Sequence, residues 1–304
     1  IRAVFKQLSK KSKLTKEDCR EIRIALDDFW RESRLYYYYL KNTQISTAFI
    51  YPAYQNESLV YALREAGIKV IEFQHGVISK GAHFYVYPRN VKKLNTDMLL
   101  PDDIWVWGTY WKNTLLKGFE FKETQVKVAG DFISRPSSIL FSAKKEKILL
   151  VTLSTGTQSF FVPYLKKIYG YLPKHPGWKI KVKLHPGDPN NQVYFNEFDG
   201  NNLIELVDKQ TNISECLKTA ALQISIFSNT LFEAVGTNTI NFCLDVDNRF
   251  KGFVDEIVSA GVACLLNPDE DPIEQYELIS TTFKSPEKQL FFSEFSISND
   301  SVSL

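Results

Sequence analysis

The sequence predicts an α/β protein with two domains, each built on a parallel sheet. Most of the predicted strands are short, nearly continuous apolar runs, which are typical of strands buried on both faces. They alternate along the chain with segments that have the 3.6-residue period of amphipathic helices. This alternation occurs on both sides of residues 132–146, a stretch of Pro, Ser and Lys without periodicity. The 304 residues suffice for two domains of about 150 residues each.

The first half begins with a helical region that ends near residue 43. Thr15 is suited to be its N-cap, and the four tyrosines of 36–39 are expected to close the helix against the sheet. Asn56 and Gly67 are predicted to begin and end a second helix. The predicted strands of this half are 46–51, 68–73, 103–107 and 125–129, with helices over 56–66 and 109–117. Four strands are few, so either the first strands are missing from the chain or the N-terminal helix replaces them; Ile1 in place of Met is consistent with truncation.

The second half repeats the alternation. Its predicted strands are 147–153, 178–184, 203–207, 222–227 and 239–244, and its predicted helices are 160–171, 212–219, 228–235, 254–260 and 272–283. Parallel strands covered by helices on both faces form a Rossmann-like domain. We therefore predict two Rossmann-like domains, 1–135 and 147–285, with a linker over 136–146, a C-terminal tail over 286–304 and a cleft between the domains.

Charge and composition exclude several classes of protein. The net charge of +2 does not indicate a nucleic-acid partner. The four cysteines have no paired spacing, which predicts free thiols rather than disulfides or a zinc site. No apolar run approaches the ~18 residues of a membrane span, and no signal peptide is present, so we expect a cytoplasmic protein. The lysines within 6–16 and 144–147 are either solvated or contact the anionic inner face of the plasma membrane.

Polar residues collect at five predicted strand ends, divided between the two domains. The sets are Glu72 with Gln74 and His75, Gly130 with Asp131, Ser154–Thr157, Lys183 with His185, and Ser228–Thr230. Ligands of open α/β sheets bind at the carboxyl ends of the strands. The five sets therefore predict a ligand cleft.

In the first domain the candidate general bases are Glu72, His75, His83 and Asp131. Gly76 lets the chain turn directly after His75. A buried His75 that is hydrogen-bonded to the backbone is the alternative. A metal site is not favoured, because His75 and His83 are eight positions apart and have no obvious third ligand.

In the second domain two hydroxyl-rich loops follow strands. Ser154-Thr155-Gly156-Thr157 precedes a helix and is either a phosphate loop or a plain N-cap, since it lacks the established phosphate-loop spacings. Ser228-Asn229-Thr230 has the same two interpretations, and Glu233, one turn later, could accept the hydroxyls of a ribose.

The segment Lys183-Leu184-His185-Pro186 is more specific. It follows a strand, the proline fixes the turn, and the imidazole of His185 is expected to project toward the cleft. A second His-Pro pair begins at His175, but it follows a helix, so we interpret it as a surface turn on the opposite edge of the sheet.

Together these motifs resemble GT-B glycosyltransferases of bacterial surface-polysaccharide (lipopolysaccharide and capsule) synthesis. The K-x-H-P segment and the Ser/Thr loop resemble the donor site of transferases that use CMP-activated sialic acid or Kdo, and that of teichoic-acid polyol-phosphate polymerases. In those families the histidine and the Ser/Thr cluster contact the donor phosphate. By resemblance those roles fall on His185, Ser228, Asn229 and Thr230. The sialyltransferases' paired-acid-glycine motif is not present in that form, and Glu72-Phe73-Gln74-His75-Gly76 stands in its place.

The resemblance implies metal-independent transfer of a sugar from a nucleotide-activated donor, with a CMP-sugar favoured, to a glycan or glycolipid acceptor. It implies no cofactor beyond the donor itself. The first domain would bind the acceptor and supply the base, and the second would bind the donor. Two alternatives stay open. One is a nucleotide-sugar 2-epimerase or polyol-phosphate transferase of the same fold, and the other is a non-catalytic nucleotide- or glycan-binding module.

Overall fold

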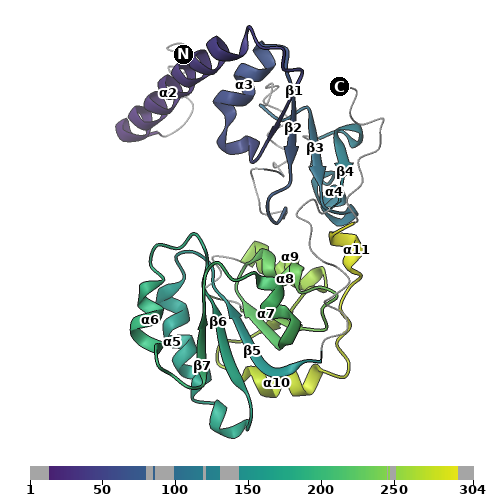
Figure 1. The fold of residues 1–304 in the computed structure, drawn as a ribbon. Coiled ribbons are helices and arrows are strands. Elements are labelled where there is room, and N and C mark those ends of the chain that lie inside the picture. The colour runs from purple at the N-terminus through teal and green to yellow at the C-terminus, as the bar shows by residue number, and fades with distance from the viewer. Residues whose placement is uncertain are drawn as a thin grey trace.

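Two separate parallel sheets organise the protein, as predicted (Figure 1). The computed structural model describes residues 14–79, 85, 99–118, 121–130, 144–244, 246 and 251–293. The first sheet has four strands in the order β1-β2-β3-β4, and the second has six in the order β10-β9-β8-β5-β6-β7. All of their pairings are parallel. The two sheets and their helices are called the first and the second lobe below.

The first lobe follows the predicted alternation. Its elements are α2 (Lys16–Leu40), β1 (Thr47–Ile50), η1 (Ala53–Gln55), α3 (Glu57–Glu65), β2 (Lys69–Phe73), β3 (Asp103–Val106), α4 (Thr109–Leu115), η3 (Glu123–Gln125) and β4 (Val126–Val128). Strand β2 lies between β1 and β3, with Glu72 beside Ile50 and Ile104. This central position buries Glu72, whose exposed fraction is 1%.

Helix α2 begins as predicted but ends differently. The Thr15 hydroxyl accepts a hydrogen bond from Asp18 N (3.1 Å), and Asp18 accepts one from Thr15 N (2.7 Å), which forms a capping box. The prediction that the tyrosines close the helix against the sheet is wrong. Tyr38 and Tyr39 are 65% and 68% exposed, and α2 packs on α3. Four consecutive helical residues point in four directions, so they cannot share one buried face.

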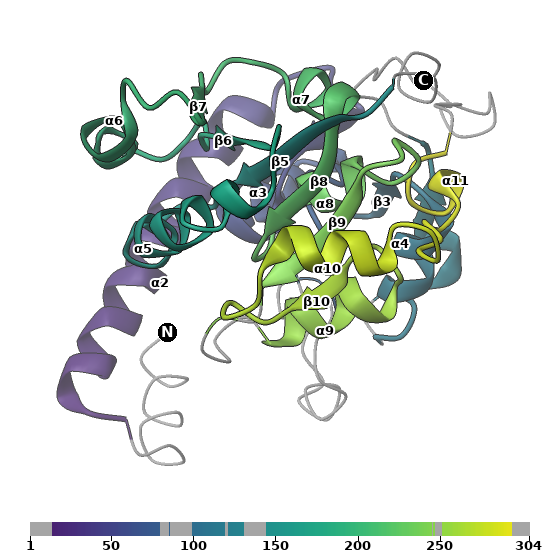
Figure 2. The ribbon, with the colours of Figure 1, turned by 90° about the horizontal axis from the view of Figure 1, so that it is seen from below.

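The second lobe contains the larger sheet. Its elements are β5 (Glu146–Thr152), α5 (Gln158–Tyr169), η4 (Leu172–Lys174), β6 (Lys179–Lys183), α6 (Gln192–Phe198), β7 (Ile204–Val207), α7 (Ile213–Thr219), β8 (Ala220–Ser225), α8 (Asn229–Glu233), β9 (Ile240–Leu244), α9 (Lys251–Ser259), β10 (Cys264–Leu266) and α10 (Pro272–Ile279). The strands follow one another from β10 to β7 in Figure 2. Strand β10 and helix α6, which have three and seven residues, were not predicted.

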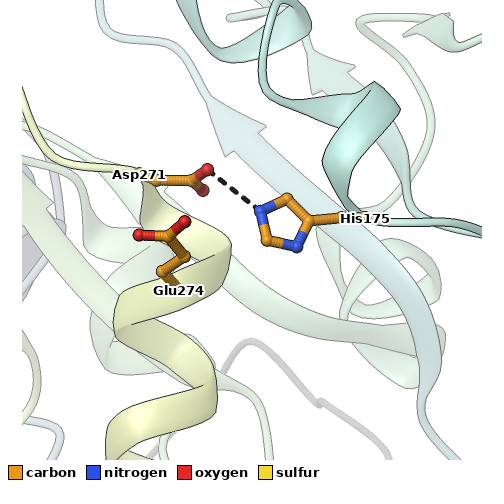
Figure 3. A group of neighbouring side chains, drawn as sticks. All are labelled: His175, Asp271 and Glu274. Carbon is orange, nitrogen blue, oxygen red and sulfur yellow. Dashed lines mark hydrogen bonds and ion pairs between the residues drawn. The ribbon is translucent and has the colours of Figure 1, made fainter.

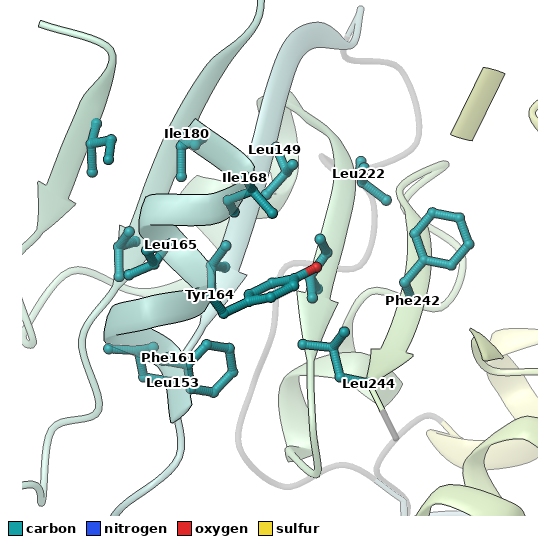
Figure 4. Packing of buried hydrophobic residues seen from close by; sticks show 14 of the residues in the cluster. Leu149, Leu153, Phe161, Tyr164, Leu165, Ile168, Ile180, Leu222, Phe242 and Leu244 are labelled. Carbon is teal, nitrogen blue, oxygen red and sulfur yellow. The ribbon is translucent and has the colours of Figure 1, made fainter. Parts of the chain in front are cut away.

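Both faces of the second sheet are covered. Leu149 and Val151 of β5 face α5, α6 and α10, whereas Ile148 and Leu150 face α7. On the first of these faces Tyr164 and Leu165 of α5 pack against the strands (Figure 4). Apolar residues on both faces of one strand explain why β5 reads as a continuous apolar run.

The C-terminal segment returns to the first lobe. Helix α11 (Lys288–Phe291) packs on α4, and Trp111 Nε1 donates to Phe291 O at 2.8 Å. A side chain at Gly108 would place its Cβ 2.4 Å from Leu290 O, so this approach requires glycine. Part of the segment predicted as a tail thus joins the two lobes.

The basic residues around 145 are partly internal. Lys145 Nζ donates to Leu217 O (2.6 Å) and to Thr239 Oγ1 (3.0 Å), and Lys147 Nζ donates to Pro176 O (3.2 Å). Lys145 is therefore not simply solvated, as one alternative had it, and the contact of this cluster with a membrane stays a prediction. The cluster within 6–16 lies largely outside the described residues.

None of the helices in the described ranges is both long and apolar enough to cross a bilayer. The cysteines are all free thiols, as predicted: Cys19, Cys216, Cys243 and Cys264.

Candidate functional site

A cavity of about 670 Å³ lies between the two lobes. Tyr54, His75 and Val77 line it from the first lobe. The second lobe contributes residues at or after the carboxyl ends of four strands, together with two residues of α9. These are Thr152, Leu153, Ser154, Thr155, Lys183, Leu184, His185, Pro186, Lys209, Thr211, Ile213, Phe227, Ser228, Asn229, Thr230, Phe253 and Ile257.

The cavity brings together half of the predicted site residues. Those that line it are His75, Ser154, Thr155, Lys183, His185, Pro186, Ser228, Asn229 and Thr230. Those that do not are Glu72, Gln74, Gly76, Gly130, Gly156, Thr157 and Glu233. His83 and Asp131 lie outside the described residues.

His185 lines the second-lobe wall of the cavity. Its Nδ1 accepts a hydrogen bond from Gly187 N at 3.1 Å and lies 3.2 Å from Thr155 Oγ1. Because Nδ1 accepts the backbone N–H, the neutral ring carries its proton on Nε2. His185 therefore offers an N–H donor, which suits a phosphate oxygen.

The Ser228–Thr230 loop combines a cap with a cluster of hydroxyls. Ser228 Oγ accepts from Thr230 N at 3.2 Å, so the capping interpretation is correct for Ser228. Thr230 Oγ1 lies 3.0 Å from both Ser228 Oγ and Thr152 Oγ1, and it accepts from the buried Gln223 side chain at 2.7 Å. Three hydroxyls thus lie together on the cavity wall. Hydroxyl hydrogens rotate, so the cluster can donate to an anionic ligand.

The Ser154–Thr157 loop is mostly structural. Ser154 Oγ donates to Phe227 O (2.8 Å), and Thr157 Oγ1 donates to Ser154 O (2.5 Å). Gly156 has a φ of +75°, which favours glycine, and its N–H faces the Asp188 carboxylate at 3.4 Å. A carboxylate already occupies the N-terminus of α5, so phosphate there would meet like charge. Only Thr155 presents an exposed hydroxyl to the cavity.

The ammonium group of Lys183 is hydrogen-bonded to backbone carbonyls of the protein. It donates to the carbonyl oxygens of Leu184 (3.0 Å), Asp208 (2.9 Å) and Lys209 (2.9 Å), and burial lowers its pKa. All three N–H donors are used, so the side chain fixes the loop after β7 instead of binding substrate. That loop carries Lys209 and Thr211 into the cavity. The carboxyl end of β7 was missed in the sequence, although the same rule about strand ends applies to it.

Four side chains form a hydrogen-bonded row on the first-lobe wall. The Tyr85 hydroxyl donates to Glu72 Oε1 at 2.6 Å and lies 3.1 Å from His75 Nδ1. The Tyr54 hydroxyl lies 3.2 Å from His75 Nε2. Since the Tyr85 proton is donated to Glu72, its oxygen accepts from His75 Nδ1–H, and Nε2 accepts from Tyr54. Neither tyrosine was predicted as a site residue. Tyr54 lies in η1 just after β1, where the rule about strand ends applies, whereas Tyr85 belongs to no motif.

This arrangement changes the assignment of the base. Glu72 lines a separate cavity of about 80 Å³, behind Tyr54 and Tyr85, whereas His75 lines the large cavity. The alternative of a buried His75 that is hydrogen-bonded to the backbone does not fit, since the residue is half-buried and its two ring nitrogens face tyrosine hydroxyls. Burial lowers the pKa of His75, which keeps the ring neutral and able to accept a proton.

Gln74 supports the loop instead of facing the cavity. Its Nε2 donates to Gly76 O (2.9 Å), and its Oε1 accepts from Trp107 N (2.9 Å). The next residues meet the second lobe, where Asn229 Oδ1 accepts from Val77 N at 3.0 Å. Asn229 thus joins the two walls of the cavity.

The burial of Glu72 predicts a pH-dependent stability. Burial raises its pKa from 4.5 to about 7, although the hydrogen bonds from Tyr85 and Ala53 N oppose this rise. A raised carboxyl pKa favours folding at low pH, and this stabilisation is lost as pH rises from about 4.5 to about 7. We expect Glu72→Gln to gain about 3 kcal/mol of unfolding free energy relative to the wild type between pH 4.5 and 8. Urea denaturation at both pH values tests this, and a difference that does not change with pH would contradict it.

His175, Asp271 and Glu274 form the group of potential metal ligands found in the described residues, and their ligand atoms lie within 4.8 Å of one another (Figure 3). His175 Nε2 and Asp271 Oδ2 are 2.9 Å apart, and Asp271 Oδ1 accepts from Ile273 N to cap α10. The interpretation of His175 as a surface turn is wrong for its side chain, which is 9% exposed. His175 precedes β6, on the edge opposite to the cavity, and its contact with Asp271 ties this turn to α10.

We expect His175→Ala to lower the free energy of unfolding by about 2 kcal/mol, because Asp271 loses a buried partner. Turnover per folded molecule should not change. Urea denaturation and an active-site titration measure the two quantities. Glu274→Gln, at an exposed residue of the same group, is the control and should change stability by less than about 0.5 kcal/mol. A loss of wild-type stability on adding EDTA would contradict the structural role and indicate a bound metal.

Comparisons with known proteins define the fold. The sequence matches no family model, and it matches no curated protein. Among solved structures, the chain is similar to UDP-GlcNAc 2-epimerase from Neisseria meningitidis bound to UDP-GlcNAc, with a TM-score of 0.58, 14% identity, and coverage of 90% of this chain and 78% of that one. It is also similar to UDP-GlcNAc 2-epimerase from Methanocaldococcus jannaschii, with a TM-score of 0.55, 15% identity, and coverage of 92% of this chain and 80% of that one. A third similar structure is the glycotransferase of kitacinnamycin, with a TM-score of 0.56, 13% identity, and coverage of 90% of this chain and 76% of that one. The chain has the GT-B-like arrangement of two parallel sheets that epimerases and glycosyltransferases share.

Proposed function

We propose that this protein is a metal-independent glycosyltransferase that moves a sugar from a nucleotide-activated donor to a glycan acceptor. One observation carries the proposal. The cavity has phosphate-suited donors on its second-lobe wall and a histidine with a free-base nitrogen on the facing wall. Transfer of a sugar between two substrates needs both features: hydrogen-bond donors for the leaving phosphate and a base for the acceptor hydroxyl.

On the donor wall, the nucleotide diphosphate or monophosphate would contact His185 Nε2–H and the hydroxyls of Thr155, Ser228 and Thr230. These groups are held by their own hydrogen bonds before substrate arrives. Donors that are fixed in advance stabilise the charge that grows on the leaving phosphate. Lys209 also lines the cavity and adds a positive charge.

On the acceptor wall, His75 would remove the proton of the attacking hydroxyl, with Tyr54 between them. The acceptor oxygen forms a bond to the anomeric carbon as the bond to the phosphate oxygen breaks. A base in this position typically contributes 10²–10⁴-fold in rate. Asp131, also considered as a base, stays a prediction.

For the donor we favour a CMP-activated acidic sugar used in bacterial surface-polysaccharide synthesis. This choice is supported by the K-x-H-P segment and the Ser/Thr loop. The similar solved structures named above include one with UDP-GlcNAc, so uridine nucleotides are the main competitor.

Thermal shift of the full chain with CMP, CDP, UDP and GDP is the test. A ligand at 100 times its Kd stabilises the native state by about 2.7 kcal/mol, and the melting temperature rises accordingly. We expect one cytidine nucleotide to give the largest shift. The absence of any shift would overturn the assignment of the donor wall.

A nucleotide-sugar 2-epimerase is the second candidate, because two of the similar structures are such enzymes. It would convert the nucleotide-sugar without any acceptor, whereas a transferase would not release an epimer. The nucleotide-sugar that binds is incubated with the protein, with and without a glycan acceptor, and the products are analysed. This experiment distinguishes the epimerase from the transferase. Binding without turnover across donors would favour a non-catalytic module.

A further inference from the structure

The hydrogen-bonded row from Tyr54 to Glu72 crosses the wall between the two cavities. Tyr54 and His75 line the large cavity, and Tyr85 and Glu72 line the small one, as Tyr54 does too. Its three steps measure 3.2, 3.1 and 2.6 Å, all within hydrogen-bond reach. The row therefore connects the substrate side with a carboxyl group that substrate does not touch.

We propose that Tyr85 is a positioning residue that couples His75 to Glu72, so that the proton taken from the acceptor hydroxyl ends on the buried carboxylate. The proposal rests on the proposed function for the origin of the proton. The coupling itself is a property of the protein without substrate.

The transfer balances at every step. The acceptor proton passes to Tyr54, whose own hydroxyl proton moves to His75 Nε2. The Nδ1 proton of His75 moves to Tyr85, and the Tyr85 hydroxyl proton moves to Glu72. Glu72 changes from carboxylate to neutral acid, and the negative charge is carried away by the leaving phosphate. His75 stays neutral, and only its tautomer changes.

The surroundings of Glu72 support this role. Ala53, Leu99, Leu100, Pro101 and Phe121 make most of the small cavity apolar. The titratable side chains that face Glu72 among the described residues are those of Tyr54, Tyr85 and Glu57. Burial raises the pKa of Glu72 to about 7 and lowers the pKa of His75, so the buried carboxylate is the more favourable final acceptor of the proton.

Tyr85→Phe removes the coupling and keeps the ring. In the full chain without substrate, ¹⁵N NMR of the four histidines, with His75→Asn for assignment, reports the tautomer of His75. We expect the Nδ1–H form in the wild type and the Nε2–H form in Tyr85→Phe, since the ring then donates to Tyr54. An unchanged tautomer would overturn the coupling, whatever the protein's activity.

Turnover tests the destination of the proton. We expect Tyr85→Phe and Glu72→Gln each to lower kcat at least tenfold, to leave the KM for the donor within about twofold, and to remove the same limb of the pH profile. Tyr110→Phe is the matched control, because it deletes another Tyr–Glu hydrogen bond, which is part-buried and measures 3.0 Å from Tyr110 to Glu256, and it should keep the wild-type profile. If the tautomer switches but both variants keep the wild-type kcat and profile, the carboxylate does not receive the proton and the proposal fails. A wild type that turns over no nucleotide-sugar refutes the proposed function, and the NMR result still decides the coupling.

Discussion

Replacement of His185 by alanine is expected to lower kcat by about 10²–10³-fold while the protein stays folded. The ring offers its Nε2–H to the donor phosphate, where charge grows during the reaction. Its other contacts are one backbone N–H and one threonine hydroxyl, both at the rim of the cavity. The loss of these contacts should shift the melting temperature by only a few degrees, as for a change of about 1 kcal/mol.

His185→Asn separates the two roles of this side chain. The asparagine oxygen can replace Nδ1 as the acceptor for Gly187 N–H, but its amide does not reach the position of Nε2. We expect this variant to be as stable as the wild type and as inactive as His185→Ala. Recovery of turnover in His185→Asn would show that the imidazole only shapes the turn, and would refute its contact with the phosphate.

Replacement of His75 by alanine is expected to have the larger effect, a loss of about 10²–10⁴-fold in kcat. His75 holds the proton acceptor that faces the cavity, and neither Tyr54 nor Glu72 can replace it. Glu72 is separated from the cavity, and burial raises the pKa of Tyr54. Single-turnover kinetics with saturating donor and acceptor measures the chemical step directly.

Donor binding distinguishes a base from a binding residue. Calorimetry with the nucleotide should give a Kd for His75→Ala within about twofold of the wild type, because His75 lies on the wall opposite His185 and the hydroxyl cluster. His185→Ala should weaken nucleotide binding in the same experiment. A large loss of nucleotide affinity in His75→Ala with normal kcat would assign His75 to the donor site instead.

The sequence by itself determined the order of the elements. Periodicity and apolar runs predicted nine of the ten strands in the described residues, because a buried strand or an amphipathic helix is encoded by residues that are neighbours in the chain. It also located His75, His185 and the Ser228–Thr230 loop, since strand ends mark where ligands bind in parallel sheets. The very short β10 carries too few residues for a recognisable pattern.

Only the tertiary structure decided which of these side chains are available. Lys183 and Gln74 looked like ligand residues in the sequence, but carbonyls and an N–H from other segments occupy them. Glu72 and Tyr85 are 13 positions apart, and their contact is visible only in the tertiary structure. A side chain's function depends on which hydrogen-bond partners contact it in the folded protein, and sequence spacing does not encode these contacts. The fold was therefore readable from local patterns, whereas the chemistry of the cavity depended on long-range contacts.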